Sequence, residues 1–204
     1  MAGDPGPIHK APPRERRIKM RERIAQLLPE VDWICDRELK EKVLATYEDA
    51  LKTGGWEPDD MARIPFTLLI PNCPASYLTH VRGVTRMAKA AMDEFNALYR
   101  DEGGYRLDND RLIAGALLHD VGKLVEYEKD PEGKTVKSQM GKDLRHPFSG
   151  TVIAMRNGIP SDIAHIIANH AHEGDGSLRS PEGVMVNKAD FMNFETIKSF
   201  LGMK

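Results

Sequence analysis

The sequence contains little cysteine, no excess of charge of either sign and no long apolar run. Its two cysteines, Cys35 and Cys73, form no CxxC pair, so free thiols in a reducing compartment are the simplest interpretation. Because 29 Lys and Arg residues stand against 31 Asp and Glu residues, the formal net charge of -2 gives no indication of binding to nucleic acid polymers or to membranes.

Other absences restrict the class of protein further. No apolar stretch approaches the ~20 residues that a transmembrane helix requires, and the first residues lack the apolar core of a signal peptide. The glycine-rich nucleotide loops GxGxxG and GxxxxGK[ST] are missing, and we find no internal repeat. We therefore expect a soluble cytoplasmic protein.

Composition divides the 204 residues into three segments. Residues 1–13, with four prolines and two glycines, are expected to form a disordered arm, in which His9 is solvated. Residues 14–75 contain two helical stretches and a proline-rich loop, which we expect to pack on the core. Residues 76–198 alternate helical stretches with turns and form the main domain. The predicted fold class is all-α, a helical bundle with an N-terminal helical extension.

The proline-rich loop lies in MARIPFTLLIPNCPASYLTH, residues 61–80. Pro65, Pro71 and Pro74 exclude a continuous helix and disfavour a central strand. We expect an ordered apolar loop that enters a helix at Ser76, a suitable N-cap. The loop either lines a pocket beside His80 or only packs on the core.

Local signals predict where several helices begin and end. Gly54-Gly55 should end the second helix, and Asp110 should cap an apolar helix that ends at His119-Asp120, with Gly122 as its stop. Ser161 or Asp162 should cap the helix that runs to His170. The polar segment 126–143 is either a flexible loop or a short hairpin around Glu132-Gly133, and acts as a lid or as a plain surface loop.

The most informative feature is a series of histidines and aspartates in the order H…HD…H…H…D. The six residues are His80, His119, Asp120, His146, His170 and Asp190. Neutral imidazole and carboxylate are ligands of borderline divalent metals such as iron, manganese and zinc. Most of the six stand at helix ends or inside apolar helices, where an unpaired carboxylate is costly unless a cation compensates it. One shared site for two metals explains all of them.

These motifs resemble the HD superfamily of metal-dependent phosphohydrolases. The resemblance covers roughly residues 76–198 and lies in His80 within SYLTHVRGVTRMA, in HDVGK at 119–123 and in Asp190 within VNKADF. His146 in LRHPFSG and His170 in IIANHAHEGDG are similar to the dinuclear branch. The resemblance implies a first metal on His80, His119, Asp120 and Asp190, and a second on His146 and His170, bridged by Asp120. The two divalent ions are expected to be Fe or Mn, with Zn, Co, Ni or Mg as alternatives.

His170 and His172 stand two positions apart in NHAHE, so on a helix they cannot share a face. We assign the metal to His170 and leave His172 as a substrate contact, with the exchange of roles left open. The predicted substrate contacts are Lys123, Arg145, Ser149, His172 and Arg179. Asp120 and Lys123 are the predicted catalytic residues, and Lys123 would approach a phosphate as a point charge.

The first function considered is hydrolysis of a phosphoester or phosphoanhydride bond in a nucleotide or small phosphorylated metabolite. Two metals would bind the phosphoryl oxygens and a bridging water, whose lowered pKa yields hydroxide near neutral pH. Later segments are similar to HD hydrolases of dinucleoside polyphosphates and to HD-GYP cyclic dinucleotide phosphodiesterases. Here NH followed by AHE replaces the expected HH pair, and SLRSP replaces GYP, which disfavours the second group.

Other functions use the same six ligands. Di-iron oxygenases similar to myo-inositol oxygenase, or a metal-dependent hydrolase of C–O or C–N bonds, would suit the apolar loop and a small organic substrate. A non-catalytic module with a structural metal is disfavoured, because structural zinc sites are usually closed and cysteine-rich. Homo-oligomer formation through the N-terminal helices is left open.

Overall fold

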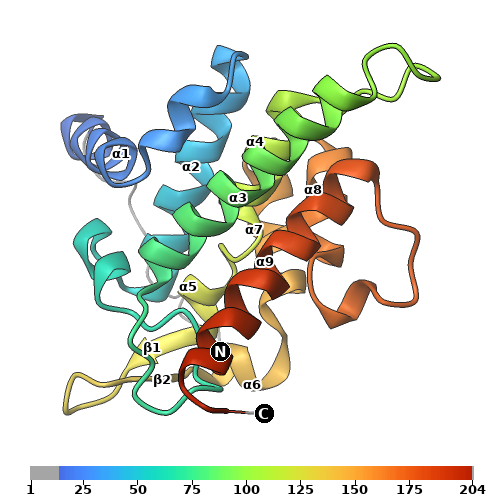
Figure 1. Cartoon of the computed structure of the whole chain (residues 1–204). Coiled ribbons are helices and arrows are strands. Elements are labelled where there is room, and N and C mark those ends of the chain that lie inside the picture. The colour runs from blue at the N-terminus through green and yellow to red at the C-terminus, as the bar shows by residue number, and fades with distance from the viewer. Residues whose placement is uncertain (1–13, 204) are drawn as a thin grey trace, which may run out of the picture.

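Helices make up most of the computed structural model, which describes residues 14–203 (Figure 1). The helices are α1 (Arg14–Leu27), α2 (Arg37–Gly54), α3 (Tyr77–Leu98), α4 (Asn109–Leu118), α5 (Lys123–Glu126), α6 (Gln139–Asp143), α7 (His146–Arg156), α8 (Ser161–Asn169) and α9 (Pro181–Phe200). Short 3-10 turns are η1 (Pro29–Trp33), η2 (Pro58–Ala62) and η3 (His172–Gly174). Strands β1 (Tyr127–Lys129) and β2 (Thr135–Lys137) form one small antiparallel hairpin. The predicted all-α class is confirmed.

Helix α3 runs through the middle of the bundle. Its buried residues Tyr77, Val81, Val84 and Ala88 recur every three or four positions, so one face of the helix is apolar. This face packs on α4 and α9, and Figure 1 shows α3 lying beside α9. The hydroxyl of Ser76 accepts a hydrogen bond from the Thr79 amide at 3.1 Å, which confirms the predicted N-cap.

Helix α4 lies deepest in the core. Every residue from Leu112 to Leu118 is buried, because α2, α3, α8 and α9 surround the helix. Such a helix ends in the protein interior, and the next two residues, His119 and Asp120, are buried as well. The apolar sequence of α4 therefore delivers two polar side chains to the centre of the molecule.

The N-terminal helices share the same core. Ile24 of α1 and Tyr47 of α2 belong to one hydrophobic cluster with Leu117 and Val186. The Tyr47 hydroxyl donates a hydrogen bond to the carbonyl oxygen of Leu117. The predicted arm at residues 1–13, with His9, lies outside the described residues.

Two predicted helix caps are wrong. Asp108, not Asp110, caps α4 by accepting from the Arg111 amide at 2.8 Å. The Asp110 carboxylate instead accepts from the amides of Cys35 and Asp36, and so ties α4 to the start of α2. Helix α8 follows Pro160 without a side-chain cap, so neither Ser161 nor Asp162 has the predicted role. The carboxylates of Asp110 and Asp162 instead accept hydrogen bonds from groups that are distant in sequence, which local sequence signals do not reveal.

Gly122 does not end a helix through a left-handed conformation. Its φ is -64°, and it precedes α5, whereas Gly55 ends α2 as predicted with a φ of 72°. A Cβ atom at Gly122 would overlap the carbonyl oxygen of His146. This glycine therefore permits a close approach between the chain after Asp120 and the first turn of α7.

The remaining expectations concern loops, thiols and membranes. Of the two forms expected for the polar segment 126–143, the structure has the short hairpin, in which Tyr127 pairs with Lys137. Both cysteines are free, as expected. Within residues 14–203, no helix combines the length and the apolar character that a membrane crossing would need.

Gly122→Ala should lower the free energy of unfolding by about 2 kcal/mol, because the added methyl group meets backbone atoms that cannot rotate away. Urea unfolding measures the effect. Gly176→Ala is the matched control, because nothing lies within 4 Å of a Cβ atom at that position. Equal stability of the two variants would contradict the packing role of Gly122.

Candidate metal centre

The six predicted ligands converge from separate elements. His80 lies on α3, His119 and Asp120 follow α4, and His146 begins α7. His170 caps the C-terminus of α8, and Asp190 lies on α9. Their side chains are buried except that of Asp190, which is 16% exposed. A tertiary fold that brings these polar groups together in its interior requires something to compensate them.

One group of candidate ligands comprises His80, His119 and Asp190, whose donor atoms lie within 4.8 Å of one another. The Nε2 atom of His80 is 3.1 Å from Oδ1 of Asp190 and 3.3 Å from Nε2 of His119. Two imidazoles and a carboxylate at this spacing are a suitable donor set for a divalent transition metal.

A second group comprises Asp120, His146 and His170, again with donor atoms within 4.8 Å. The Nε2 atoms of His146 and His170 lie 3.2 Å and 3.5 Å from Oδ1 of Asp120. His172 does not belong to this group. The geometry thus favours His170 over His172 as the candidate ligand.

Asp120 joins the two groups. Its Oδ2 atom lies 3.2 Å from Nε2 of His80 and 3.4 Å from Nε2 of His119, while Oδ1 faces His146 and His170. Oδ1 is buried and accepts no hydrogen bond from the described part of the chain. A buried carboxylate oxygen without a partner is costly, and a cation beside it would remove the cost. The residues present therefore fit a divalent metal.

All four histidines are oriented in the same way. In each ring the Nδ1 atom donates to an oxygen. His80 donates to Oδ1 of Asn193 at 2.8 Å and His146 to Oε2 of Glu126 at 2.9 Å. His119 and His170 donate to the backbone carbonyls of Ala116 and Ile167, at 2.6 Å and 2.8 Å. A proton held on Nδ1 leaves the lone pair on Nε2, which is the atom that points into the site. The surroundings prepare each ring for metal binding.

Charges within the site are strongly coupled. Burial alone would raise the pKa of Asp120, but Lys123 and His119 hold it well below its usual range. Burial likewise opposes ionisation of Asp190, and His80 lowers that pKa to about 2. Burial would lower the pKa of His80, yet the carboxylates of Asp120 and Asp190 raise it to about 9. Both carboxylates are therefore held in their ionised form: Lys123 offsets the charge of Asp120, and the ring of His80, which contacts both Asp120 and Asp190, offsets the charge of the pair.

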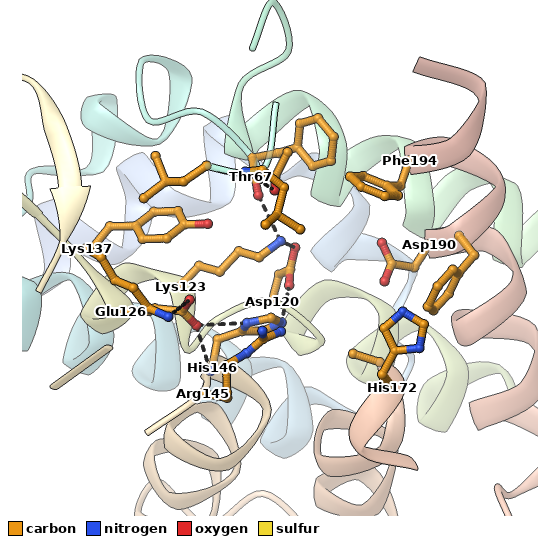
Figure 2. A pocket seen from close by; sticks show the side chains of 16 residues that line it. Thr67, Asp120, Lys123, Glu126, Lys137, Arg145, His146, His172, Asp190 and Phe194 are labelled. Carbon is orange, nitrogen blue, oxygen red and sulfur yellow. Dashed lines mark hydrogen bonds and ion pairs between the residues drawn. The ribbon is translucent and has the colours of Figure 1, made fainter. Parts of the chain in front are cut away.

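A pocket of about 220 Å³ opens onto this centre (Figure 2). Three of the five predicted substrate contacts, Lys123, Arg145 and His172, line this pocket. The Lys123 ammonium group is buried and donates to Oδ2 of Asp120 at 2.6 Å and to the carbonyl oxygen of Phe66 at 2.8 Å. His172 is exposed at the rim, and its Nδ1 lies 3.0 Å from Oδ2 of Asp175.

Two of the predicted substrate contacts do not line the pocket. Ser149 is buried in α7 and donates to the carbonyl oxygen of His146 at 3.4 Å. The Arg179 guanidinium group donates to the carbonyl oxygens of Asn169 and Ala171, so it fixes the loop after α8. The structure gives both side chains a role inside the fold instead.

Several residues around the site were not predicted. Glu126 accepts from both the ring and the backbone amide of His146, and Asn193 accepts from His80. Phe66 stacks on the His80 ring with centroids 4.5 Å apart. Asn193 follows Asp190 by three positions and so shares its helix face, which is a usable signal. No sequence signal marked Glu126 or Phe66, because the histidines that they contact lie outside their own helix or loop.

Comparison with known proteins adds a family and a relative. The sequence matches the family model of the HD domain over residues 77–192, more than half of the chain. It is 27% identical over 175 residues to a Methanocaldococcus jannaschii protein named dihydroneopterin 2',3'-cyclic phosphate phosphodiesterase. That match covers 81% of the chain and 66% of the relative, so it leaves about a third of the relative unmatched. No solved structure matches the sequence.

Glu126→Ala should weaken divalent metal binding by about 10- to 100-fold, because His146 loses the acceptor that sets its tautomer. Calorimetric titration with Mn²⁺ measures this affinity. Glu128→Ala is the control, because Glu128 lies two residues after Glu126, at an exposed position of β1. This variant should bind Mn²⁺ as the parent does. Unchanged affinity in Glu126→Ala would rule out the orienting role.

Proposed function

We propose that this chain, which belongs to the HD domain family and is a metal-dependent phosphohydrolase, uses two divalent metals to hydrolyse a phosphoester bond of a small phosphorylated metabolite. The observation that carries the proposal is the position of Asp120, whose two carboxylate oxygens face separate groups of histidines. Its family membership supplies the reaction class, and this geometry supports the number of metals.

His80, His119, Asp190 and one oxygen of Asp120 would hold the first metal, and His146, His170 and the other oxygen of Asp120 the second. Iron or manganese suits these imidazole and carboxylate donors best. When bound, the metals would neutralise charge on the phosphoryl oxygens and lower the pKa of a water, so no side-chain nucleophile is required.

The cationic residues of the pocket would bind and orient the phosphate. Lys123 directs a buried ammonium group at the shared carboxylate, so a phosphoryl oxygen beside Asp120 would meet this positive charge. Lys137 and Arg145 lie further out, with side chains 39% and 50% exposed, and would contact the outer oxygens. Phe66 covers the outer face of His80 and restricts the access of water to that ligand.

The substrate is expected to be small. A pocket of about 220 Å³ is below the usual range of ~300–1,000 Å³ for ligand sites, which favours one compact phosphorylated molecule over a long one. The name of the archaeal relative supports a cyclic phosphodiester as the substrate class. We therefore favour 2',3'-cyclic phosphates for the first screen.

Metal content is the first test of two metals. The parent protein, purified without chelator and without air, should contain about two Fe or Mn per chain. His146→Ala should contain about one. His165→Ala is the control, because His165 lies outside both ligand groups and should leave the content unchanged. A single metal that survives His146→Ala would overturn the two-metal proposal.

The reaction itself is tested by activity of the metal-loaded protein on 2',3'-cyclic phosphates with and without oxygen. Phosphohydrolysis should proceed equally in both. Turnover of an organic substrate that stops without oxygen, together with no release of phosphate esters, would favour the di-iron oxygenase alternative.

Lys123→Met should keep the metals but lower the rate constant by about 100-fold, because a preorganised charge at the phosphate is removed while the apolar stem stays. Steady-state kinetics and metal analysis check both parts. Lys188→Met, at an exposed position of α9, should retain the parental rate. A parental rate in Lys123→Met would exclude the proposed phosphate contact.

A further inference from the structure

The proline-rich loop between η2 and α3 is a fixed part of the pocket wall. Its two ends are joined, because the Phe66 amide donates to the Ala75 carbonyl at 3.2 Å and the Tyr77 amide donates to the Ile64 carbonyl at 2.7 Å. Inside the loop, the Thr67 hydroxyl accepts from the Leu69 amide at 3.1 Å. A loop closed at its base and braced within holds its side chains in place before a ligand arrives.

This loop presents apolar side chains to the outside. Leu68 is 38% exposed and Leu69 is 73% exposed, although Ile70 beside them is buried. A single exposed leucine is ordinary, but these two line the pocket above the metal centre. Their exposed apolar surface at a concave site is therefore available to an apolar part of a ligand.

Helix α9 contributes two aromatic residues to the same pocket. Phe191 and Phe194, one and four positions after Asp190, both line it, and Figure 2 shows Phe194 and Asp190 directed toward the cavity. Phe194 meets Phe66 edge to face, with ring centroids 6.0 Å apart, and Phe191 meets His172 in the same manner at 5.0 Å. Aromatic edges and faces therefore border the apolar side of the pocket.

The pocket is thus divided in character. Lys123, Glu126, Lys137 and Arg145 form a charged part, while the apolar part consists of the loop residues and the phenylalanines of α9. Figure 2 shows Phe194 and Asp190 on the opposite side of Asp120 from Glu126 and Lys137. A phosphate held at the centre would have its organic substituent directed to one part or the other, and an aromatic ring matches the apolar part.

We propose that Leu68 and Leu69 of the proline-rich loop, together with Phe191 and Phe194, form a binding site for an aromatic ring carried by the substrate. This proposal rests on the proposed function, since the phosphate at the metal centre fixes where the ring lies. Leu68 and Leu69 accordingly determine specificity, whereas Phe66 of the same loop holds Lys123 through its carbonyl oxygen.

Binding of two phosphonates to the Mn-loaded protein tests the proposal without turnover. Phenylphosphonate and methylphosphonate carry the same anionic group and differ in the ring alone. Calorimetry should give phenylphosphonate about tenfold tighter binding, because the ring is removed from water against apolar side chains. Leu69→Ser should weaken phenylphosphonate binding by at least about threefold and leave methylphosphonate binding unchanged.

Leu178→Ser is the matched control. Leu178 is 93% exposed in the loop before α9 and does not line the pocket, so both phosphonates should bind as they do to the parent. Equal affinity of the parent for the two phosphonates, or a loss of ring preference in both variants alike, would overturn the ring site while the phosphohydrolase proposal stands. If neither phosphonate binds, the phosphate site itself fails, and the ring site fails with it.

Discussion

The structure depends on the compensation of one buried carboxylate. Asp120 is 1% exposed and follows α4, whose residues from Leu112 to Leu118 are all buried, so its charge is largely removed from water at the base of the pocket. Lys123 offsets part of this charge through an ion pair of 2.6 Å, and the four histidines direct their Nε2 atoms at the same carboxylate. The bundle is arranged so that α3, α7, α9 and the C-terminal end of α8 each bring a candidate ligand to this point. Without Lys123 or a metal ion beside it, the buried charge of Asp120 would be a net cost to folding.

Much of this centre could be predicted from the sequence, for a physical reason. A histidine or aspartate at the end of an apolar helix is conspicuous, since its environment should be apolar. This held for His119 and Asp120, and the helical period around His80 was equally clear. Three prolines predicted an irregular loop before α3 but left open whether it lines a pocket or only packs on the core, and Phe66 of this loop both lines the pocket and stacks on His80. Such features depend on local pattern.

Features that depend on distant partners were not predictable. Asp110 is a residue type that often caps a helix, yet its carboxylate accepts hydrogen bonds from two backbone amides 74 and 75 positions away in the sequence. Gly122 resembles a helix stop, but the reason for glycine is the approach of α7. Arg179 resembled an anion contact because it is cationic and lies in a loop, and carbonyl oxygens in that loop occupy it instead. In each case the competing partner is set by the tertiary fold.

The candidate ligands of the centre come from distant parts of the chain, with His80 and Asp190 separated by 110 positions. An unfolded chain cannot hold them together, so a metal ion binds the native state in strong preference. Mass action then links metal supply to folding: free metal at 100 times its dissociation constant would stabilise the native state by about 2.7 kcal/mol. That amount is a large fraction of a typical domain's stability of ~5–15 kcal/mol. The availability of metal in the surroundings would thus govern how long the chain survives proteolysis, as well as whether it is active.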